Sequence, residues 1–443
     1  MTALSGTLIS LIGFQRLAGS VMPSVKQITA VLFPLLVPLM LLAMGTARAA
    51  EKVAPDLLVR AAALHERIIA IDSHVDIPTD FAASTGSDPA LRGDMQVDLP
   101  KMKEGGLHAA FFIVYVGQGP RDEAGYAAAK RDALVKFDAI HRMADDLYPD
   151  RIGLALDPDD VLRLRQENKL VAVIGIENGY VIGRDLSLLE DFYRRGARYM
   201  TLAHIGHNDI ADSSMPLESL NDKVAEHGGL SAFGRSVIAE MNRLGMMVDV
   251  SHISEAAMMQ AVEFSTAPVI ASHSATSALA PHARNLTNAQ MEALAARGGL
   301  LQVVAFPDYV EINEARRAAF LALREKVASA AGDARFSYTK HGKMEDWIEG
   351  VRQIEAEYPR PSLSIFVDHI DHAVQIMGID HVGISSDFGG GGGVVGWNDA
   401  SETLNVTAEL IRRGYSEEDI AKLWGQNLLR VWREVGAAAS EKP

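Results

Sequence analysis

Eight short apolar runs constrain the fold of this chain more than any other feature of its sequence. Turn residues bound each run, and stretches of helical composition separate one run from the next. Strands that are buried on both faces of a parallel sheet have this pattern. The runs are Ile68 to Ser73, Ala109 to Val116, Val171 to Ile176, Tyr199 to Ala203, Met246 to Val250, Pro268 to Ser272, Leu300 to Phe306 and His381 to Ser386. Eight alternations of strand and helix predict an α/β fold, a (βα)8 TIM barrel.

The helical stretches between the runs are consistent with this fold. Several of them end at a glycine, which commonly terminates a helix before the next strand. The clearest are Glu123 to Asp146, Leu186 to Gly196, Gly234 to Leu244, Glu255 to Phe264 and Thr287 to Ala296. A doubly wound open sheet remains the alternative, because counting runs does not distinguish a closed sheet from an open one.

One interval is longer than the others, since about 74 residues separate the seventh run from the eighth. Residues 310 to 360 in this interval are charged and are predicted to be helical. Ser364 to Met377 is predicted to be the helix that returns to the last strand. An insertion between the seventh and eighth strands explains the excess length without a second domain.

The first 49 residues have the organisation of a signal peptide. Lys26 precedes an apolar run from Ile28 to Met44, and small residues typical of a cleavage site follow at Ala47-Arg48-Ala49-Ala50. We therefore expect an exported protein whose barrel domain spans residues 50 to 443. A retained membrane anchor is the weaker alternative, because two prolines interrupt the apolar run. Residues 1 to 21 form an N-terminal extension ahead of the usual basic start, and Met22 would be a more ordinary first residue. N-terminal sequencing of the unprocessed product distinguishes a start at Met22 from one at Met1.

The composition excludes several classes of function. The formal net charge is −15, and there is no stripe of Lys and Arg to neutralise phosphates, so nucleic acid is not expected as a partner. The chain contains no cysteine, which excludes disulfides, thiolate zinc sites and cysteine nucleophiles. A metal site in this chain therefore has to use His, Asp and Glu.

Side chains of this kind follow four of the predicted strands, at the rim where the carboxyl ends of barrel strands meet. His74 and Asp76 follow the first run and lie two residues apart, so they share a face of an extended segment. Glu177 follows the third run, and His252 and His273 follow the fifth and the sixth. Each residue alone has a simpler explanation, a strand-capping carboxylate or a structural histidine. Five in equivalent positions predict a metal site.

Three more polar side chains extend the same pattern. His204 ends the fourth run, Asp387 ends the eighth, and Arg284 follows the sixth. For Arg284 alone, an ordinary surface residue is the simpler explanation. The glycines from Gly389 to Gly393 lack the Lys-Ser/Thr that follows the glycines of a phosphate-binding loop, so we expect a plain flexible loop there.

These segments, taken in order, resemble the membrane or renal dipeptidase family of zinc peptidases over about residues 65 to 435. The matching stretches are Asp72-Ser73-His74-Val75-Asp76, Gln96-Val97-Asp98-Leu99-Pro100 with Glu104-Gly105-Gly106, Gly175-Ile176-Glu177, Leu202-Ala203-His204, Val248-Asp249-Val250-Ser251-His252, Pro268-Val269-Ile270-Ala271-Ser272-His273-Ser274, Arg284-Asn285 and Ser386-Asp387-Phe388. Animal members of the family are lipid-anchored and disulfide-linked, whereas this chain has no cysteine and no hydrophobic C-terminal tail. It therefore resembles a bacterial exported member, periplasmic or extracellular and without a stable membrane anchor.

The resemblance implies a metal centre with two Zn2+ ions per chain. One ion would take His74 and Asp76, the other would take His252 and His273, and Glu177 would bridge both. These are the same residues that their positions after the predicted strands had already identified as candidate metal ligands.

The resemblance also implies a zinc-dependent dipeptidase, a metallopeptidase whose substrate is a small dipeptide. A metal-bridging hydroxide would attack the peptide carbonyl. His204 would bind the substrate and stabilise the oxyanion, and Arg284 would pair with the terminal carboxylate. Asp387 would contact the substrate and carry the proton from the nucleophile to the leaving amine.

Two other functions stay open at this point. A zinc amidohydrolase of another specificity, such as a lactonase or an acyl-amino-acid deacylase, would share the site but not the substrate. Turnover of a small panel of dipeptides would distinguish it. A non-catalytic binding protein that kept the barrel is disfavoured by the intact ligand set and Asp387. A homodimer stays among the assemblies that we consider.

Overall fold

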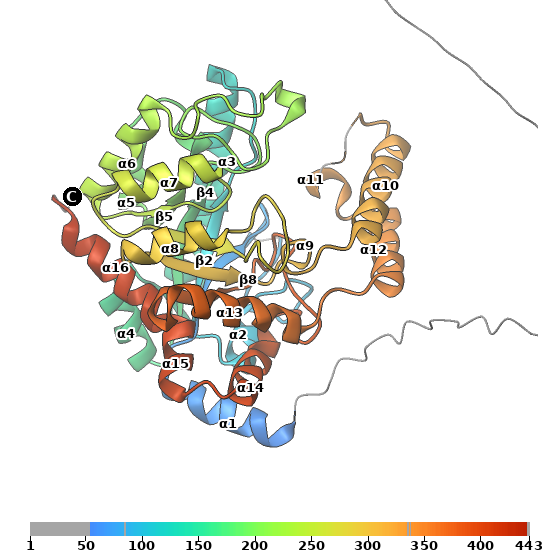
Figure 1. Ribbon diagram of the computed structural model, residues 1–443. Helices are drawn as coiled ribbons and strands as arrows, with labels where there is room; N and C mark the ends of the chain where they lie inside the picture. The colour runs from blue at the N-terminus through green and yellow to red at the C-terminus, as the bar shows by residue number, and fades with distance from the viewer. Residues whose placement is uncertain (1–53, 84–85, 335, 337, 441–443) are drawn as a thin grey trace, which may run out of the picture. The chain divides into compact units, whose positions relative to one another are not determined.

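Parallel strands form the centre of the protein and helices pack around them in the computed structural model of the chain (Figure 1). The structure describes residues 54–83, 86–334, 336 and 338–440. The predicted signal peptide, residues 1 to 49, lies outside these described residues. Within them, the search for a helix long and apolar enough to cross a membrane finds none.

Eight strands follow one another around the sheet in chain order, and each lies within or overlaps one of the eight predicted runs. They are β1 (Ile71–Asp76), β2 (Ala109–Tyr115), β4 (Leu170–Glu177), β5 (Ala197–Thr201), β6 (Met247–Asp249), β7 (Ile270–Ser274), β8 (Leu300–Val304) and β9 (Val382–Ser385). Neighbouring strands are parallel throughout. A ninth strand, β3 (Ile152–Leu154), was not predicted, because three residues with a central glycine give no recognisable apolar run. It pairs with β4 outside the main path.

The sheet closes between its first and last strands. Val75 and Phe388 form a parallel bridge, and the Asp76 amide donates a hydrogen bond of 2.7 Å to the Phe388 carbonyl. The carboxylate of Asp72 in β1 also accepts a bond of 3.0 Å from the amide of Ser386. The predicted (βα)8 barrel is therefore confirmed, and the open-sheet alternative is wrong.

The helices lie on the outside of the barrel, and several begin at the side chains that favour helix starts (Figure 1). Asp157, Ser254 and Thr287 each accept a hydrogen bond from a backbone amide of the first turn. The helices are α1 (Pro55–His65), α2 (Leu99–Gly105), α3 (Glu123–His141), α4 (Pro158–Gln166), α5 (Leu188–Arg194), α6 (Ala232–Leu244), α7 (Glu255–Phe264), α8 (Asn288–Ala296), α13 (Leu363–Met377), α14 (Thr403–Arg413), α15 (Glu417–Ala421) and α16 (Asn427–Ala438).

Side chains from alternate positions along the strands fill the barrel interior and pack against α16. Phe111, Val173 and Tyr199 point into this set, and Trp432 of α16 lies 5.9 Å from the Phe111 ring. Packing of this kind leaves the barrel a filled core and not a pore, as in other (βα)8 barrels. Polar groups with reactive chemistry can therefore gather only at the rim formed by the carboxyl ends of the strands.

The predicted insertion between the last two strands of the barrel is a helical lobe beside it (Figure 1). The lobe contains α10 (Glu314–Ala330), α11 (Tyr338–His341) and α12 (Glu345–Glu357), whereas α9 (Pro307–Val310), which precedes it, packs on the barrel through Tyr309. Leu323, Val327, Trp347 and Ile354 form a small hydrophobic core within this lobe.

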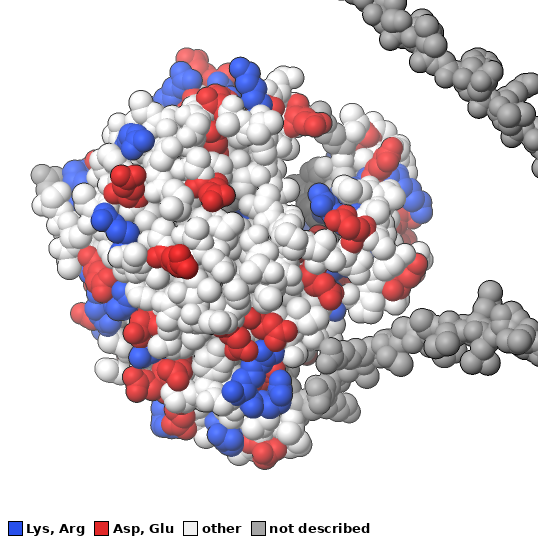
Figure 2. Space-filling model, viewed as in Figure 1, with Lys and Arg blue, Asp and Glu red and all other residues white. Residues whose placement is uncertain are grey.

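On the face of the molecule shown in Figure 2, acidic and basic side chains are interspersed and neither kind gathers into a continuous patch.

Two buried histidines lie near the amino-terminal ends of the first two strands. The His108 Nδ1 atom accepts a bond of 3.0 Å from the Ala70 amide, which requires a neutral ring. His65 donates to the Gly106 carbonyl at 2.9 Å, and its other nitrogen lies 2.7 Å from the Thr407 hydroxyl. Burial lowers the pKa of His65 to about 4 and that of His108 to about 3.

We expect acidification to destabilise the protein through these two rings. In the unfolded chain a histidine has a pKa of about 6.5, so below that pH the unfolded state binds more protons than the folded state. Stability is therefore lost as the pH falls from about 6.5 toward 4. The substitution His108→Asn keeps an acceptor for the Ala70 amide but does not titrate, so its melting temperature should fall less over this range than that of wild type.

Thermal unfolding followed by circular dichroism at several pH values measures this difference, and comparison with wild type removes the contribution of the other groups. His372→Asn is a matched control, since that ring makes a solvent-exposed hydrogen bond of 2.9 Å to Asn288. The same pH dependence in wild type and His108→Asn would contradict the prediction.

Candidate metal centre

The five predicted ligands converge at the carboxyl ends of the strands. His74 and Asp76 lie on β1, Glu177 ends β4, His252 follows β6, and His273 lies on β7. Their side chains form, with His204 and Asp387, three overlapping groups whose ligand atoms lie within 4.8 Å of one another. Of the five predicted ligands, all but Asp76 are buried, and the Asp76 side chain is 13% exposed.

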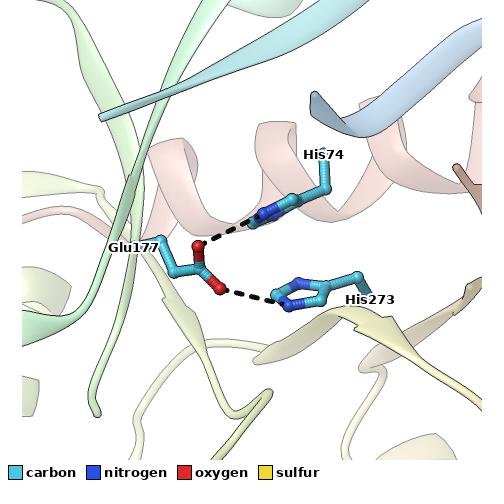
Figure 3. A group of neighbouring side chains, drawn as sticks. All are labelled: His74, Glu177 and His273. Atoms are coloured by element: carbon cyan, nitrogen blue, oxygen red, sulfur yellow. Dashed lines mark ion pairs between the residues drawn. The ribbon is translucent and has the colours of Figure 1, made fainter. Parts of the chain in front are cut away.

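Glu177 is the centre of this cluster. Its Oε2 atom lies 3.5 Å from Nε2 of His74, and its Oε1 atom lies 3.0 Å from Nε2 of His252 and 3.3 Å from Nε2 of His273. Figure 3 shows the two oxygens directed to different imidazoles, His74 on one side and His273 on the other. One carboxylate thus faces two sets of nitrogen ligands.

The donor atoms fit a metal ion. The Nε2 atom of His74 is buried and has no hydrogen-bond partner among the described residues, although it lies 3.5 Å from the carboxylates of both Asp76 and Glu177. The Nε2 atoms of His252 and His273 lie 2.8 Å apart. Imidazole nitrogens and carboxylate oxygens gathered in this way are the ligand set of zinc sites without cysteine.

Electrostatics favour the ligating forms of most of these groups. Burial alone would raise the pKa of Glu177, but the charges of His204 and His74 and the close polar contacts with His252 and His273 lower it well below its usual value. Burial lowers the pKa of His273 to about 4 and that of His252 well below its usual value. Cations bind deprotonated carboxylates and neutral imidazoles, so these states suit metal binding.

His74 differs from the other imidazoles. Burial lowers its pKa, but the neighbouring Glu177 and Asp76 carboxylates raise it well above the usual histidine value. In the metal-free protein a proton therefore serves as the counter-charge to these carboxylates, and binding of a cation releases it.

The loop after β9 places Asp387 beside this group. Asp387 has a φ of 58°, a left-handed conformation that is uncommon for residues other than glycine and is typical of functional sites. A Cβ atom at Gly390 would lie 2.3 Å from Oδ1 of Asp387 and 2.5 Å from Oδ2 of Asp76. The glycine segment is therefore more than the plain flexible loop that we expected, because Gly390 leaves the space that the two carboxylates occupy.

His204 and Arg284 also reach the site. His204 follows β5, and its Nε2 atom lies 3.5 Å from Oε1 of Glu177. Arg284 is 2% exposed, so its interpretation as a surface residue is wrong. Its Nη2 atom donates to the His273 carbonyl at 2.9 Å and its Nη1 atom to the Ser274 hydroxyl at 3.2 Å.

A cavity of about 290 Å³ adjoins Arg284 and His252. The Arg284 Nε atom has no hydrogen-bond partner in the part of the chain that the structure describes. A buried guanidinium with an unused donor at a cavity suits an anionic group of a small ligand. The Arg284 guanidinium lies over the ring of Tyr309, with 5.2 Å between the guanidinium carbon and the ring centroid.

Sequence analysis missed the polar residues behind the ligands. Asp249 and Tyr199 were treated as members of buried apolar runs. The Tyr199 hydroxyl contacts the His74 ring, and Asp249 accepts hydrogen bonds from Ser251 and Ser272, the residues directly before His252 and His273. An acid inside a strand that is buried on both faces needs donors, which was the available signal for Asp249. The ring of His207 stabilises the loop after β5, because it accepts a bond of 2.9 Å from the Ser213 amide and lies 2.8 Å from the Lys223 carbonyl.

Comparisons with known proteins find similar sequences over most of the chain. The profile of the family described as membrane dipeptidase, peptidase family M19, matches residues 58–443. Dipeptidase tcpJ of Claviceps purpurea is 34% identical over 369 residues, which are 82% of this chain and 75% of the fungal protein.

Solved structures are similar as well. The crystal structure of the probable dipeptidase PvdM from Pseudomonas aeruginosa is 36% identical and covers 87% of this chain and 100% of its own, with a TM-score of 0.77. A metallo peptidase from Rhodobacter sphaeroides, liganded with a phosphinate mimic of the dipeptide L-Ala-D-Ala, is 22% identical with a TM-score of 0.64. It covers 83% of this chain and 99% of its own, and at this identity the likeness is one of fold.

The substitution Gly390→Ala should weaken metal binding by about tenfold or more, because the new methyl group displaces the Asp76 and Asp387 carboxylates. Competition with a chelator measures the affinity, and the melting temperature reports on the fold. Gly436→Ala in α16 is a control, since no atom lies within 4 Å of its added Cβ. An unchanged metal affinity in Gly390→Ala would show that the two carboxylates do not depend on this glycine.

Proposed function

The chain belongs to the membrane dipeptidase family, peptidase family M19, and we propose that it is a binuclear zinc dipeptidase that hydrolyses the peptide bond of dipeptides. The observation that carries this proposal is the position of Glu177, whose two oxygens face different imidazoles. A carboxylate in this position can bridge two cations, and a site with one metal ion would not need it to face both ways.

His74 and Asp76 would hold one zinc ion, His252 and His273 the other, and Glu177 both. When bound, a pair of zinc ions polarises the substrate carbonyl and lowers the pKa of a shared water toward about 7, which supplies a hydroxide nucleophile at neutral pH.

The remaining residues act on the substrate. His204, next to Glu177 at the rim, would donate a hydrogen bond to the carbonyl oxygen as negative charge develops there. Asp387 would accept the proton of the nucleophile and deliver it to the leaving amine. Without a metal ion, burial raises the pKa of this carboxyl well above its usual value.

Arg284 would fix the length of the substrate. Its two terminal nitrogens are anchored to the segment of His273 and Ser274, so the guanidinium lies at a set distance from the metal ligands. A terminal carboxylate paired with Arg284 would hold the scissile bond at a fixed distance from that carboxylate. This geometry favours dipeptides over longer peptides.

Glu177→Ala should lose zinc and activity together. Removal of the carboxylate leaves each set of imidazoles without its shared ligand, so bound zinc should fall from two ions per chain to one or none, and kcat/KM should fall by more than about 100-fold. Elemental analysis of the purified protein gives the zinc content. Glu263→Ala, at an exposed position of α7, is the matched control. Two zinc ions retained in Glu177→Ala would refute the bridging role.

Arg284→Ala should discriminate between substrates that differ only in their terminal group. On a dipeptide, kcat/KM should fall by about 100-fold or more, because a buried charged hydrogen bond to the carboxylate is lost. On the corresponding dipeptide amide, which has no carboxylate, the variant should differ much less from wild type. Equal losses on both substrates would sink the assignment, and preferred turnover of lactones or acylated amino acids by wild type would favour another amidohydrolase specificity.

A further inference from the structure

A chain of buried hydrogen bonds extends from His273 away from the metal centre. The His273 Nδ1 atom lies 2.8 Å from the Ser272 hydroxyl, which donates at 2.6 Å to Oδ2 of Asp249. Asp249 is fully buried at the end of β6. Its Oδ1 atom accepts bonds from the amides of Ser251 at 3.0 Å and Ser272 at 2.9 Å, and its Oδ2 atom also accepts from the Thr201 hydroxyl.

These contacts determine which nitrogen of His273 carries its hydrogen. An ionised carboxylate only accepts, so Ser272 must use its single hydroxyl hydrogen on Asp249. Ser251, whose hydroxyl lies 3.4 Å from that of Ser272, is a weaker competitor. The short contact between Ser272 and His273 is then satisfied only if the Nδ1–H group of His273 donates. The lone pair is left on Nε2, the atom that faces Glu177 at 3.3 Å.

The other imidazoles of the centre are supported differently. The Nδ1 atom of His74 lies 3.0 Å from the Tyr199 hydroxyl, whose hydrogen goes to the Ser73 carbonyl at 3.0 Å. This series of hydrogen bonds therefore ends at an uncharged carbonyl and does not reach a carboxylate. The Nδ1 atom of His252 has no partner among the residues that the structure describes. The bonds behind His273 are thus the ones that lead to a buried carboxylate.

We propose that Asp249 is a positioning residue, which acts through Ser272 to keep His273 in the tautomer that presents Nε2 to a metal ion. The inference rests on the proposed function in that it requires a metal ion at His252 and His273. A carboxylate behind a metal-bound histidine fixes its tautomer and raises its basicity, and loss of such a partner typically weakens metal binding by about 10- to 100-fold.

Asp249→Asn tests this because it reverses the direction of the hydrogen bonds with almost no change in shape. The oxygen of the new amide can still accept from the two backbone amides, so its NH2 group must face Ser272 and donate to it. Ser272 then donates to Nδ1 of His273, and the hydrogen of that ring moves to Nε2, where it blocks the metal. Zn2+ titration of metal-free protein against a chromophoric chelator should show one of two affinities lowered by about 10- to 100-fold.

The double variant Asp249→Asn/Ser272→Ala separates this role from a structural one. Without the Ser272 hydroxyl nothing donates to Nδ1 of His273, so Zn2+ binding should recover to the level of Ser272→Ala alone and exceed that of Asp249→Asn. If the two substitutions instead damaged the structure independently, the double variant would bind Zn2+ more weakly than either single variant. Ser272→Ala itself should lose about tenfold at one site, and it provides the test if Asp249→Asn does not fold.

Thr201→Val is the matched control, because it removes the other hydroxyl on the same Asp249 oxygen and leaves the path to His273 intact. Its melting temperature should fall while both zinc affinities stay as in wild type. Wild type that bound no zinc would overturn the proposed function together with this inference. Wild type with two ions, and an Asp249→Asn variant that binds both as tightly, would overturn the inference alone.

Discussion

The closure between β1 and β9 is the contact on which the site depends. The bond between the Asp76 amide and the Phe388 carbonyl joins the first and last strands directly beside Asp76 and Asp387. Asp72, two residues before His74, accepts from the Ser386 amide on the far side of the same seam. Because Asp76 and Asp387 come from opposite ends of the domain, barrel closure is what brings Asp387 to the candidate metal ligands.

Closure also concentrates charge at a buried place. Glu177, Asp76 and Asp387 approach one another at the rim, where isolated charges would be strongly disfavoured. The protein balances them with imidazoles in front and with hydrogen bonds behind, such as those from Tyr199 to Ser73 and from Ser272 to Asp249. The site is therefore supported on both sides, and under our proposal the hydrogen bonds behind His273 leave its Nε2 atom available for a metal ion.

Much of this arrangement could be predicted from the sequence, for a physical reason. A strand buried on both faces leaves an apolar run, and a polar residue directly after it must lie at a rim. His74, Glu177, His252 and His273 share that local signature, and the structure brings them together. Asp249 and Tyr199 lack it, because they lie inside strands and their roles come from neighbours distant in the chain. Taken alone, Arg284 had an ordinary surface residue as its simpler interpretation, because the sequence around it does not show that the folded chain buries it.

The sequence by itself determined the order of strands and helices, the inserted lobe and the set of candidate ligand residues, because each of these follows from local patterns of apolar and polar residues. Only the tertiary structure decided that the sheet closes, that Glu177 faces two sets of imidazoles, and that Gly390 leaves space for two carboxylates. Each of those features depends on contacts between segments that lie far apart in the chain. Local patterns do not specify such contacts, whereas the packing of a closed barrel does.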